Sequence, residues 1–277
     1  MALIGGVSLW TAVTGEGPPL MLLHGGPGAP DYLGPLAALL PARVHRHEQR
    51  GCGRSEEGPA PVTIRALLDD LDGLRAHWGL ERCVVGGHSW GASLALLYAL
   101  ERPARVTRLL YLNGMGIETG WEREHAGNVR ARLAEEDVAR HAALVRARDA
   151  AASEEERDRL SAEAFAIAVK ADCPDPAVRA EVRALLRGPF RRRINQALVA
   201  EWNAMLPALA PRVSRCEVAA LLVQGARDTR PNGPARRLAE RLPDARYVEL
   251  DGAGHFPWME RPEAFLEAVG PWIGGVP

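Results

Sequence analysis

The most constraining feature of this chain is a serine that lies between an apolar β-type run and an apolar helical run. Cys83 to Gly87 is typical of a strand and Leu94 to Leu100 of a buried helix, so the chain turns sharply through His88 to Gly91. A tight strand-to-helix turn of this kind exposes a serine hydroxyl above the edge of a parallel sheet, and the small neighbours relieve crowding. The pattern therefore predicts an accessible, reactive Ser89.

Other apolar runs predict the sheet around this turn. They are short, as in parallel strands covered on both faces, and comprise Leu20 to Leu23, Leu109 to Leu112 and Ala219 to Val223. Helical patterns lie between several of them, such as a helix capped by Thr63 and stopped by Gly79. Arg43 to Glu48 occupies a strand position despite its polarity. We expect an α/β fold with a mostly parallel, doubly wound sheet.

The amino-acid composition of the chain changes between about Met115 and Arg212. Strand-like runs give way to Ala, Arg, Glu and Leu, and helix starts are indicated at Ser153, with Glu156 as a capping box, and at Asp175 before Pro176. Strand-like sequence resumes near Val218. We therefore expect a core domain at 1–114 and 213–277, with a helical cap at 115–212 inserted after the sixth strand.

Composition limits the classes of function. The chain has 277 residues, 47% of them hydrophobic, a formal charge of −1 and a pI near 6.7. Such a charge gives no general attraction to nucleic acid or an anionic membrane, and no run of about 18 apolar residues occurs. The four cysteines form no C-x-x-C pair, which argues against a zinc knuckle or a disulfide framework. We expect a soluble, cytoplasmic protein with reduced cysteines.

Two later residues complete a nucleophile–base–acid set with Ser89. Asp228 follows the apolar run Leu221 to Val223, which places it at the same sheet edge, and His255 lies in a small-residue loop behind the last expected strand. The order Ser, Asp, His is one of three common triad orders. Asp228 could instead be a turn or N-cap residue, and Asp251 and Glu118 are the substitutes for the acid.

A glycine-rich loop predicts an oxyanion hole. The sequence His24 to Gly28 follows an apolar strand, and its glycines allow the backbone to approach a reacting carbonyl closely. The amides of Gly26 and Trp90 would together stabilise the developing negative charge. His24 is expected to brace the loop rather than to act as a base.

These motifs resemble the α/β-hydrolase superfamily, and within it the proline iminopeptidase branch. The branch carries a His-Gly-Gly-Pro-Gly loop, matched by His24 to Gly28, and an Asp-Gln-Arg-Gly-x-Gly-Arg-Ser block, matched by Gln49 to Ser55 with Glu48 in place of the Asp. The resemblance covers about Ile4 to Gly114 and Val218 to Ile273. It implies the α/β-hydrolase fold and a hydrolytic serine triad.

The chain also departs from that branch. His88 precedes the serine where these peptidases usually have Gly, and Thr229 stands where a Glu that holds the substrate amino group follows the triad Asp in smaller relatives. A buried ammonium needs a charged partner. Glu201 is the candidate replacement, and Trp202 and Trp121 are candidates for lining the substrate pocket. A solvated helix residue and helix packing are the respective alternatives.

The sequence as a whole predicts a cofactor-independent serine hydrolase that uses an acyl-enzyme and needs no metal. The expected substrate is a small amide, short peptide or ester, with proline-iminopeptidase-like activity first and an esterase or lactonase as the alternative. A lyase, a cyclase or a ligand-binding protein on the same fold is the alternative from another class. The sequence does not determine the oligomeric state.

Overall fold

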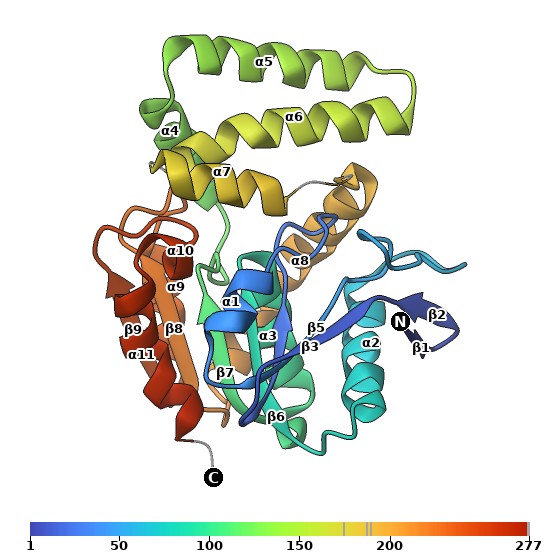
Figure 1. Ribbon diagram of the computed structural model, residues 1–277, viewed down its shortest axis with the longest axis vertical. Helices are drawn as coiled ribbons and strands as arrows, with labels where there is room; N and C mark the ends of the chain where they lie inside the picture. The colour runs from blue at the N-terminus through green and yellow to red at the C-terminus, as the bar shows by residue number, and fades with distance from the viewer. Residues whose placement is uncertain (174, 187, 189, 276–277) are drawn as a thin grey trace.

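A seven-stranded sheet forms the centre of the computed structural model, which describes residues 1–173, 175–186, 188 and 190–275. The strand order is β3-β5-β4-β6-β7-β8-β9; β3 runs antiparallel to β5 and the other neighbours are parallel (Figure 1). The strands are β3 (Thr11–Thr14), β4 (Pro19–Leu23), β5 (Arg43–His47), β6 (Cys83–His88), β7 (Val106–Leu112), β8 (Ala220–Gly225) and β9 (Ala245–Leu250). A separate hairpin pairs β1 (Ala2–Ile4) with β2 (Val7–Leu9).

Helices cover both faces of the sheet, which confirms the predicted α/β fold with a doubly wound, mostly parallel sheet. On one face α2 (Ile64–His77), α3 (Trp90–Glu101) and α9 (Gly233–Arg241) share a core with alternate residues of the strands, such as Val85 and Leu222. On the other, α1 (Gly34–Leu39), α10 (Pro257–Glu260) and α11 (Pro262–Gly274) pack against Val84 and Leu221. This alternation is what strands buried on both sides require. A short 3-10 turn (Pro103–Arg105) follows α3.

Two local predictions illustrate how the sequence produces these elements. Thr63 caps α2, because its side chain accepts a hydrogen bond from the amide of Ala66 at 3.1 Å. The polar stretch at Arg43 is indeed a strand, β5, with four of its five residues buried. Arg46 offsets the cost of its burial with an ion pair to Asp31, and the His45 ring packs 4.8 Å from the ring of Trp78.

The segment between β7 and β8 contains helices and no strand in its described part. These are α4 (Trp121–Arg132), α5 (Glu135–Ala150), α6 (Glu154–Asp172), α7 (Pro176–Leu185) and α8 (Arg192–Val213), called the cap helices below. Asp175 and Ser153 are the N-caps of α7 and α6, as predicted. In Figure 1, α4 to α7 lie above the sheet, whereas α8 descends beside it. The division at residues 115 and 212 remains a proposal.

The predicted strand count before the cap is wrong. The cap helices follow β7, which is the seventh strand of the chain and the fifth strand of the large sheet in chain order. The sequence predicted that the cap follows the sixth strand, which is true neither for all strands of the chain nor for those of the large sheet. The reason is that two of the N-terminal strands form the separate hairpin. The hydrophobic inner face of α8, including Leu198 and Leu206, belongs to the same core as α2 and α3. Within the described residues, no helix has the length and apolar character needed to cross a membrane.

Candidate active site

Ser89 occupies a strained turn between β6 and α3. Its φ of 57° lies in the left-handed region, which is unfavourable for a residue with a side chain and is typical of a nucleophile elbow. A hydrogen bond from its amide to the carbonyl of Leu112 at 2.9 Å holds the turn over the neighbouring strand. Gly87 and Gly91 are needed here, since a Cβ on either would collide with backbone atoms. The local sequence therefore presents the Ser89 side chain at the end of β6.

Asp228 and His255 meet beside this turn. Asp228 follows β8 and His255 follows β9, and Nδ1–H of His255 donates to Oδ2 of Asp228 at 2.7 Å. Asn113, at the end of β7, donates to the same oxygen at 2.8 Å. Both members of the pair are buried, with 4% of His255 and 6% of Asp228 exposed. The bond fixes the tautomer in which Nε2 of His255 is unprotonated and able to accept a proton.

Charges around Asp228 keep it ionised. Burial alone raises the pKa of its carboxyl, but the nearby His255 and Arg230 hold that pKa well below its usual range. The backbone amide of Arg230 donates to Oδ1 at 2.9 Å. The carboxylate therefore stays negative across the neutral range and can balance a positive charge on His255.

A chain of buried hydrogen bonds connects the loops that carry Ser89 and His255. Nε2–H of His88 donates to the backbone carbonyl of His255 at 2.7 Å, and Nδ1 of His88 accepts from the Tyr32 hydroxyl at 2.6 Å. The same hydroxyl accepts from the amide of Gly25 at 3.0 Å. Burial and the neighbouring His255 lower the pKa of His88, so its ring is neutral as this bonding pattern requires. His88 therefore links the elbow to the histidine loop.

Ser89 Oγ and His255 Nε2 remain open to a ligand. Within residues that the structure describes, neither atom has a hydrogen-bond partner. The His255 ring lies 4.4 Å, between centroids, from the ring of His88, the residue directly before Ser89. Catalytic hydrogen bonds are often long before a substrate binds. The sequence set of Ser89, Asp228 and His255 is thus gathered at one edge of the sheet.

The predicted oxyanion residues border Ser89. Trp90 is the first residue of α3, so its amide has no acceptor within the helix, and Gly26 turns at a φ of 53°. The loop is braced through His24, whose Nε2 accepts from the Gln49 amide at 3.0 Å, and Gln49 also accepts from the Trp90 indole at 3.1 Å. His24 thus has the bracing role expected of it.

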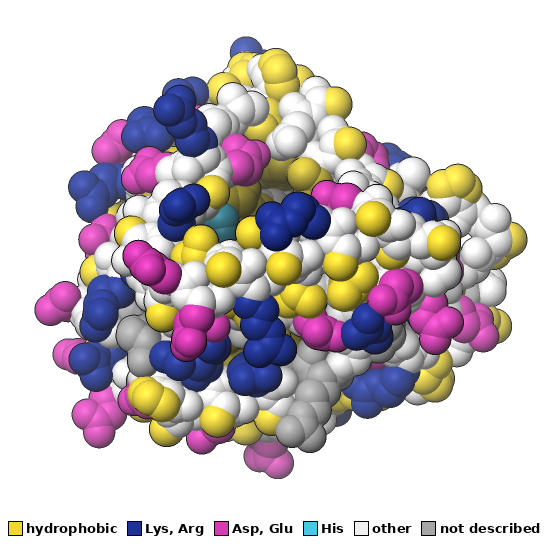
Figure 2. All heavy atoms as spheres, turned by 90° about the horizontal axis from the view of Figure 1, so that it is seen from above, with side chains coloured by type: hydrophobic (Ala, Val, Ile, Leu, Met, Phe, Trp, Pro, Cys, Tyr) yellow, Lys and Arg dark blue, Asp and Glu magenta, His cyan; other side chains and the backbone are white. Residues whose placement is uncertain are grey.

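A cavity of about 200 Å³ contains the Ser89 side chain. Residues of the oxyanion loop, the elbow, α4 and α8 line it, namely Gly26, Pro27, Ser89, Trp90, Met115, Trp121, Glu122, His125, Asn195, Val199, Trp202, Asn203 and Arg230. The α8 residues recur at helical spacing, so one face of that helix forms a wall. Seen from the cap side, the surface is hollowed, with hydrophobic side chains inside and charged ones around the opening (Figure 2).

The predicted substrate residues divide into two groups. Trp121 and Trp202 line the cavity, and Trp202 packs edge-on against Trp90 with centroids 6.1 Å apart. Glu201 does not line it, which contradicts its predicted role. Its Oε2 accepts from the amide of Ile64 at 2.8 Å, where the first turn of α2 offers an unpaired N–H and a positive dipole end. Glu201 therefore caps a helix.

Sequence reasoning missed Arg230. Its side chain lines the cavity, and Nη1 donates to Asp172 at 3.1 Å and to Asp228 at 3.3 Å. The position of an arginine two residues after the predicted acid was the available signal. Asp172 belongs to the end of α6 and had no signal, because it lies 56 residues before Asp228 in the numbering. Glu118, the alternative acid, instead binds Arg237.

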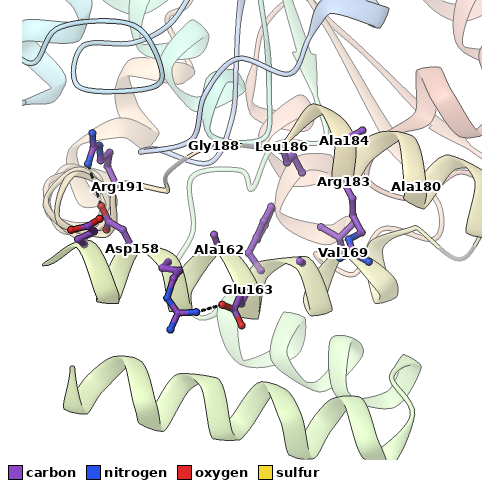
Figure 3. A pocket seen from close by; sticks show the side chains of 14 residues that line it. Asp158, Ala162, Glu163, Val169, Ala180, Arg183, Ala184, Leu186, Gly188 and Arg191 are labelled. Atoms are coloured by element: carbon purple, nitrogen blue, oxygen red, sulfur yellow. Dashed lines mark hydrogen bonds and ion pairs between the residues drawn. The ribbon is translucent and has the colours of Figure 1, made fainter. Parts of the chain in front are cut away.

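A larger groove of about 770 Å³ lies between α6 and α7 (Figure 3). Phe165 on its wall stacks on Phe190 with centroids 6.2 Å apart, and Phe190 approaches Gly26 of the oxyanion loop. Among the residues that the structure describes, none lines both this groove and the Ser89 cavity. Its charged rim includes the ion pair of Arg191 with Asp158. In the residues described here, no cluster of three or more His, Cys, Asp or Glu side chains is arranged to hold a metal ion.

Comparisons with known proteins agree with this geometry. A sequence model of the Alpha/beta hydrolase family matches residues 20–268. The chain is similar to a proline iminopeptidase of Lactobacillus delbrueckii subsp. lactis, with 24% identity over 92% of this chain and 90% of that protein. Among solved structures it resembles a proline iminopeptidase of Mycobacterium smegmatis (TM-score 0.68, 23% identity, 98% and 95% of the two chains covered).

A second solved structure points to a different chemistry on the same fold. It is the enol-lactonase from Burkholderia xenovorans, with a TM-score of 0.67, 25% identity and 97% of each chain covered. The predicted resemblance, the fold and the hydrolase class are confirmed by these matches. The chain belongs to the alpha/beta hydrolase family.

Proposed function

We propose that this protein is a cofactor-independent serine hydrolase that acts on a small ester or lactone through an acyl-enzyme. Ser89 Oγ attacks the substrate carbonyl while Nε2 of His255 takes its proton, and Asp228 orients and stabilises the resulting imidazolium. The backbone amides of Gly26 and Trp90 donate to the oxyanion of the tetrahedral intermediate. His255 returns the proton to the leaving oxygen, and the acyl group remains on Ser89.

The second half of the reaction releases the acyl group. Water enters the Ser89 cavity, His255 takes one of its protons, and the hydroxide oxygen attacks the acyl carbonyl. The tetrahedral intermediate collapses, the proton returns to Ser89 Oγ, and a carboxylic acid leaves as its carboxylate. The observation that carries the proposal is the strained Ser89 turn opening into a cavity beside the 2.7 Å bond between His255 and Asp228.

The cavity favours esters and lactones over peptides with a free amino end. Glu201, the carboxylate expected to hold an ammonium group, is bonded to the amide of Ile64. The cavity lining instead includes Arg230, a positively charged residue, together with the exposed Glu122. An ammonium group buried there would lack the partner that its burial requires, because Asp172 and Asp228 are already bonded to Arg230.

An aminopeptidase is the second candidate. The similarity to curated proline iminopeptidases over nine-tenths of the chain favours it, and Glu122 brings one carboxylate to the cavity lining. Glu122 is exposed and accepts from the amide of Gly120 at 3.1 Å. A free-amino substrate would therefore bind through Glu122 alone. The cytoplasmic location stays a prediction from the sequence.

Substitution of the nucleophile tests the proposal. Ser89→Ala should lower ester turnover by about 10³ to 10⁶ and abolish labelling by a fluorophosphonate, because both require the activated hydroxyl. Ser214→Ala, at an exposed serine at the end of α8, is the control and should change neither. Unlabelled wild-type protein that still binds ligands but hydrolyses no ester would support a binding protein, and ester turnover retained in Ser89→Ala would refute Ser89 as the nucleophile.

A substrate panel separates the two candidates. Simple nitrophenyl esters and lactones are compared with prolyl and alanyl anilides and with the N-blocked forms of those anilides. We expect hydrolysis of the esters or lactones and no preference for a free amino end. A preference for the free amine, lost in Glu122→Gln, would instead establish the aminopeptidase.

A further inference from the structure

The guanidinium of Arg230 reaches the Ser89 cavity from the loop that carries Asp228. It lies two residues after Asp228 and lines the same cavity as Ser89, Gly26 and Trp90. Its side chain is 14% exposed. Arginine side chains are seldom buried unless they are paired with other groups, so the placement of Arg230 requires an explanation.

Two buried aspartates hold Arg230 in place. Nη1 donates to Asp172 at 3.1 Å and to Asp228 at 3.3 Å, and both carboxylates are almost fully covered. Thr229 also donates to Asp172, which fixes that carboxylate on the core side. The nearby carboxylates raise the pKa of Arg230 against the effect of its burial, so the guanidinium stays charged.

Toward the described residues, the guanidinium donates through Nη1 alone. Among the described residues, Nε and Nη2 of Arg230 donate to no group, and neither is a covered, unpartnered atom. A guanidinium presents five N–H donors in one plane, and the free edge matches a carboxylate in a bidentate arrangement. A purely structural brace between two aspartates would not require these donors to remain unpaired on a residue that lines the cavity.

Neighbouring side chains add to this polar wall. Asn195 and Asn203 line the cavity from α8, and their side-chain amides have no hydrogen bond to a described residue. Trp121 and Trp202 provide the apolar part of the lining. The cavity thus offers an aromatic surface for a carbon skeleton and unpaired donors for an oxygen-rich group.

We propose that Arg230 is a specificity-determining residue that binds a carboxylate on the substrate, so that the preferred substrate is a small anionic ester or lactone. This inference rests on the proposed hydrolase function and names its substrate class. The carboxylate would lie on the free Nε and Nη2 edge, while Ser89 attacks the ester carbonyl of the same molecule. The acid product then carries two carboxylates, the one bound by Arg230 and the one that hydrolysis forms at Ser89, and both must leave the cavity.

A matched pair of esters tests the charge. 4-Nitrophenyl hydrogen succinate carries the carboxylate, and its methyl ester is the neutral counterpart with nearly the same shape. The wild type should have a higher kcat/KM for the acid, and Arg230→Gln should lower the acid-to-neutral ratio by about 10- to 100-fold, as expected for a charge-assisted hydrogen bond. Arg230→Lys keeps the charge without the planar edge and should lie between the two.

Asp172→Asn distinguishes recognition from bracing. It removes one carboxylate that holds Arg230 but leaves the guanidinium in the cavity, so the acid-to-neutral ratio should be retained even if kcat falls for both esters. A role limited to bracing predicts equal losses on both esters in Arg230→Gln and in Asp172→Asn, which would overturn the proposal. Thermal melts identify a variant that fails to fold, and Arg230→Lys then provides the comparison.

Binding measurements separate this proposal from the hydrolase function. Calorimetric titration of Ser89→Ala with monophenyl succinate should give tighter binding than with its methyl ester, and Ser89→Ala with Arg230→Gln should lose the difference. Equal hydrolysis of both esters by the wild type would reject carboxylate recognition but keep the hydrolase. Selective binding of the acid without any hydrolysis or fluorophosphonate labelling would reject the hydrolase but keep the recognition site.

Discussion

At the scale of single residues, His88 is the position whose role the chemistry of the sequence least suggested. It stands where related peptidases usually have Gly, and the structure uses both of its ring nitrogens, one toward the carbonyl of His255 and one toward Tyr32. The Tyr32 hydroxyl in turn receives the amide of Gly25. Three loops that are far apart in the sequence are therefore held in register by one buried hydroxyl and one buried imidazole.

Loss of the Tyr32 hydroxyl should disturb this register. Tyr32→Phe leaves the amide of Gly25 and Nδ1 of His88 without partners in a buried region, which should destabilise the fold by about 1–3 kcal/mol and lower kcat more than it changes KM. Urea unfolding and steady-state kinetics measure the two effects. Tyr98→Phe is the control, since its hydroxyl binds Asp72 at 3.0 Å away from the site. It should lower stability without a selective loss of kcat.

At the scale of elements, contacts between helices explain which predictions succeeded. Thr63 as a cap and the strand at Arg43 depend on neighbours in sequence or on strand position, so the sequence indicated them. Glu201 depends on a contact with Ile64, 137 positions away, and helical spacing contains no information about that partner. Asp172 was missed for the same reason, whereas Arg230 had a signal in its position two residues after Asp228. The sequence thus indicated the core and the sheet edge at which Ser89, Asp228 and His255 lie, whereas it did not indicate the contacts made by the cap helices.

The capping role of Glu201 gives a test at this scale. Glu201→Gln should reduce stability by about 0.5–2 kcal/mol, because a neutral amide interacts more weakly with the positive end of α2. It should leave the KM for every substrate unchanged. Thr63→Ala removes the neighbouring cap and should cost a similar amount in chemical denaturation. A marked rise in KM for free-amino substrates in Glu201→Gln would restore its role in substrate binding.

At the scale of the whole molecule, Glu260 makes stability depend on pH. Burial raises the pKa of its carboxyl from 4.5 to about 7, although the amides of Gly254 and Phe256 donate to it at 2.9 and 3.1 Å. The folded protein therefore binds this proton more tightly than the unfolded chain does. The stability that protonated Glu260 contributes is complete below pH 4.5 and is lost as the pH rises toward about 7.

Buried histidines have the opposite dependence. Burial lowers the pKa of His47 from 6.5 to about 3, so this neutral ring stabilises the fold above pH 6.5, and its contribution is lost as the pH falls toward 3. His45 behaves in the same way, with a pKa lowered to about 4. The molecule should therefore unfold in acid as these rings become charged, while Glu260 opposes that trend.

Glu260→Gln tests the carboxyl directly. The variant keeps an acceptor oxygen for the two amides but does not ionise. Between pH 4.5 and 7, its free energy of unfolding should therefore fall by up to about 3 kcal/mol less than that of the wild type. Urea unfolding at several pH values measures the slope. Glu267→Gln, at an exposed residue of α11, should leave the slope as in the wild type. An unchanged slope in Glu260→Gln would contradict the assignment.

The cap helices hold the backbone around Asp228 from several sides. Asn128 donates to the carbonyl of Thr229 at 2.9 Å, Arg132 binds the carbonyl of Arg227, and Asp172 pairs with Arg230. Arg191 also donates its amide to the carbonyl of Gly28 at 2.8 Å. If these helices moved away together to admit a large molecule, Asp228 and the glycine-rich loop would both lose these hydrogen bonds. A wide opening of the cap helices would therefore disrupt the proposed active site. The fold suits substrates that are small enough to enter while the cap helices stay in place.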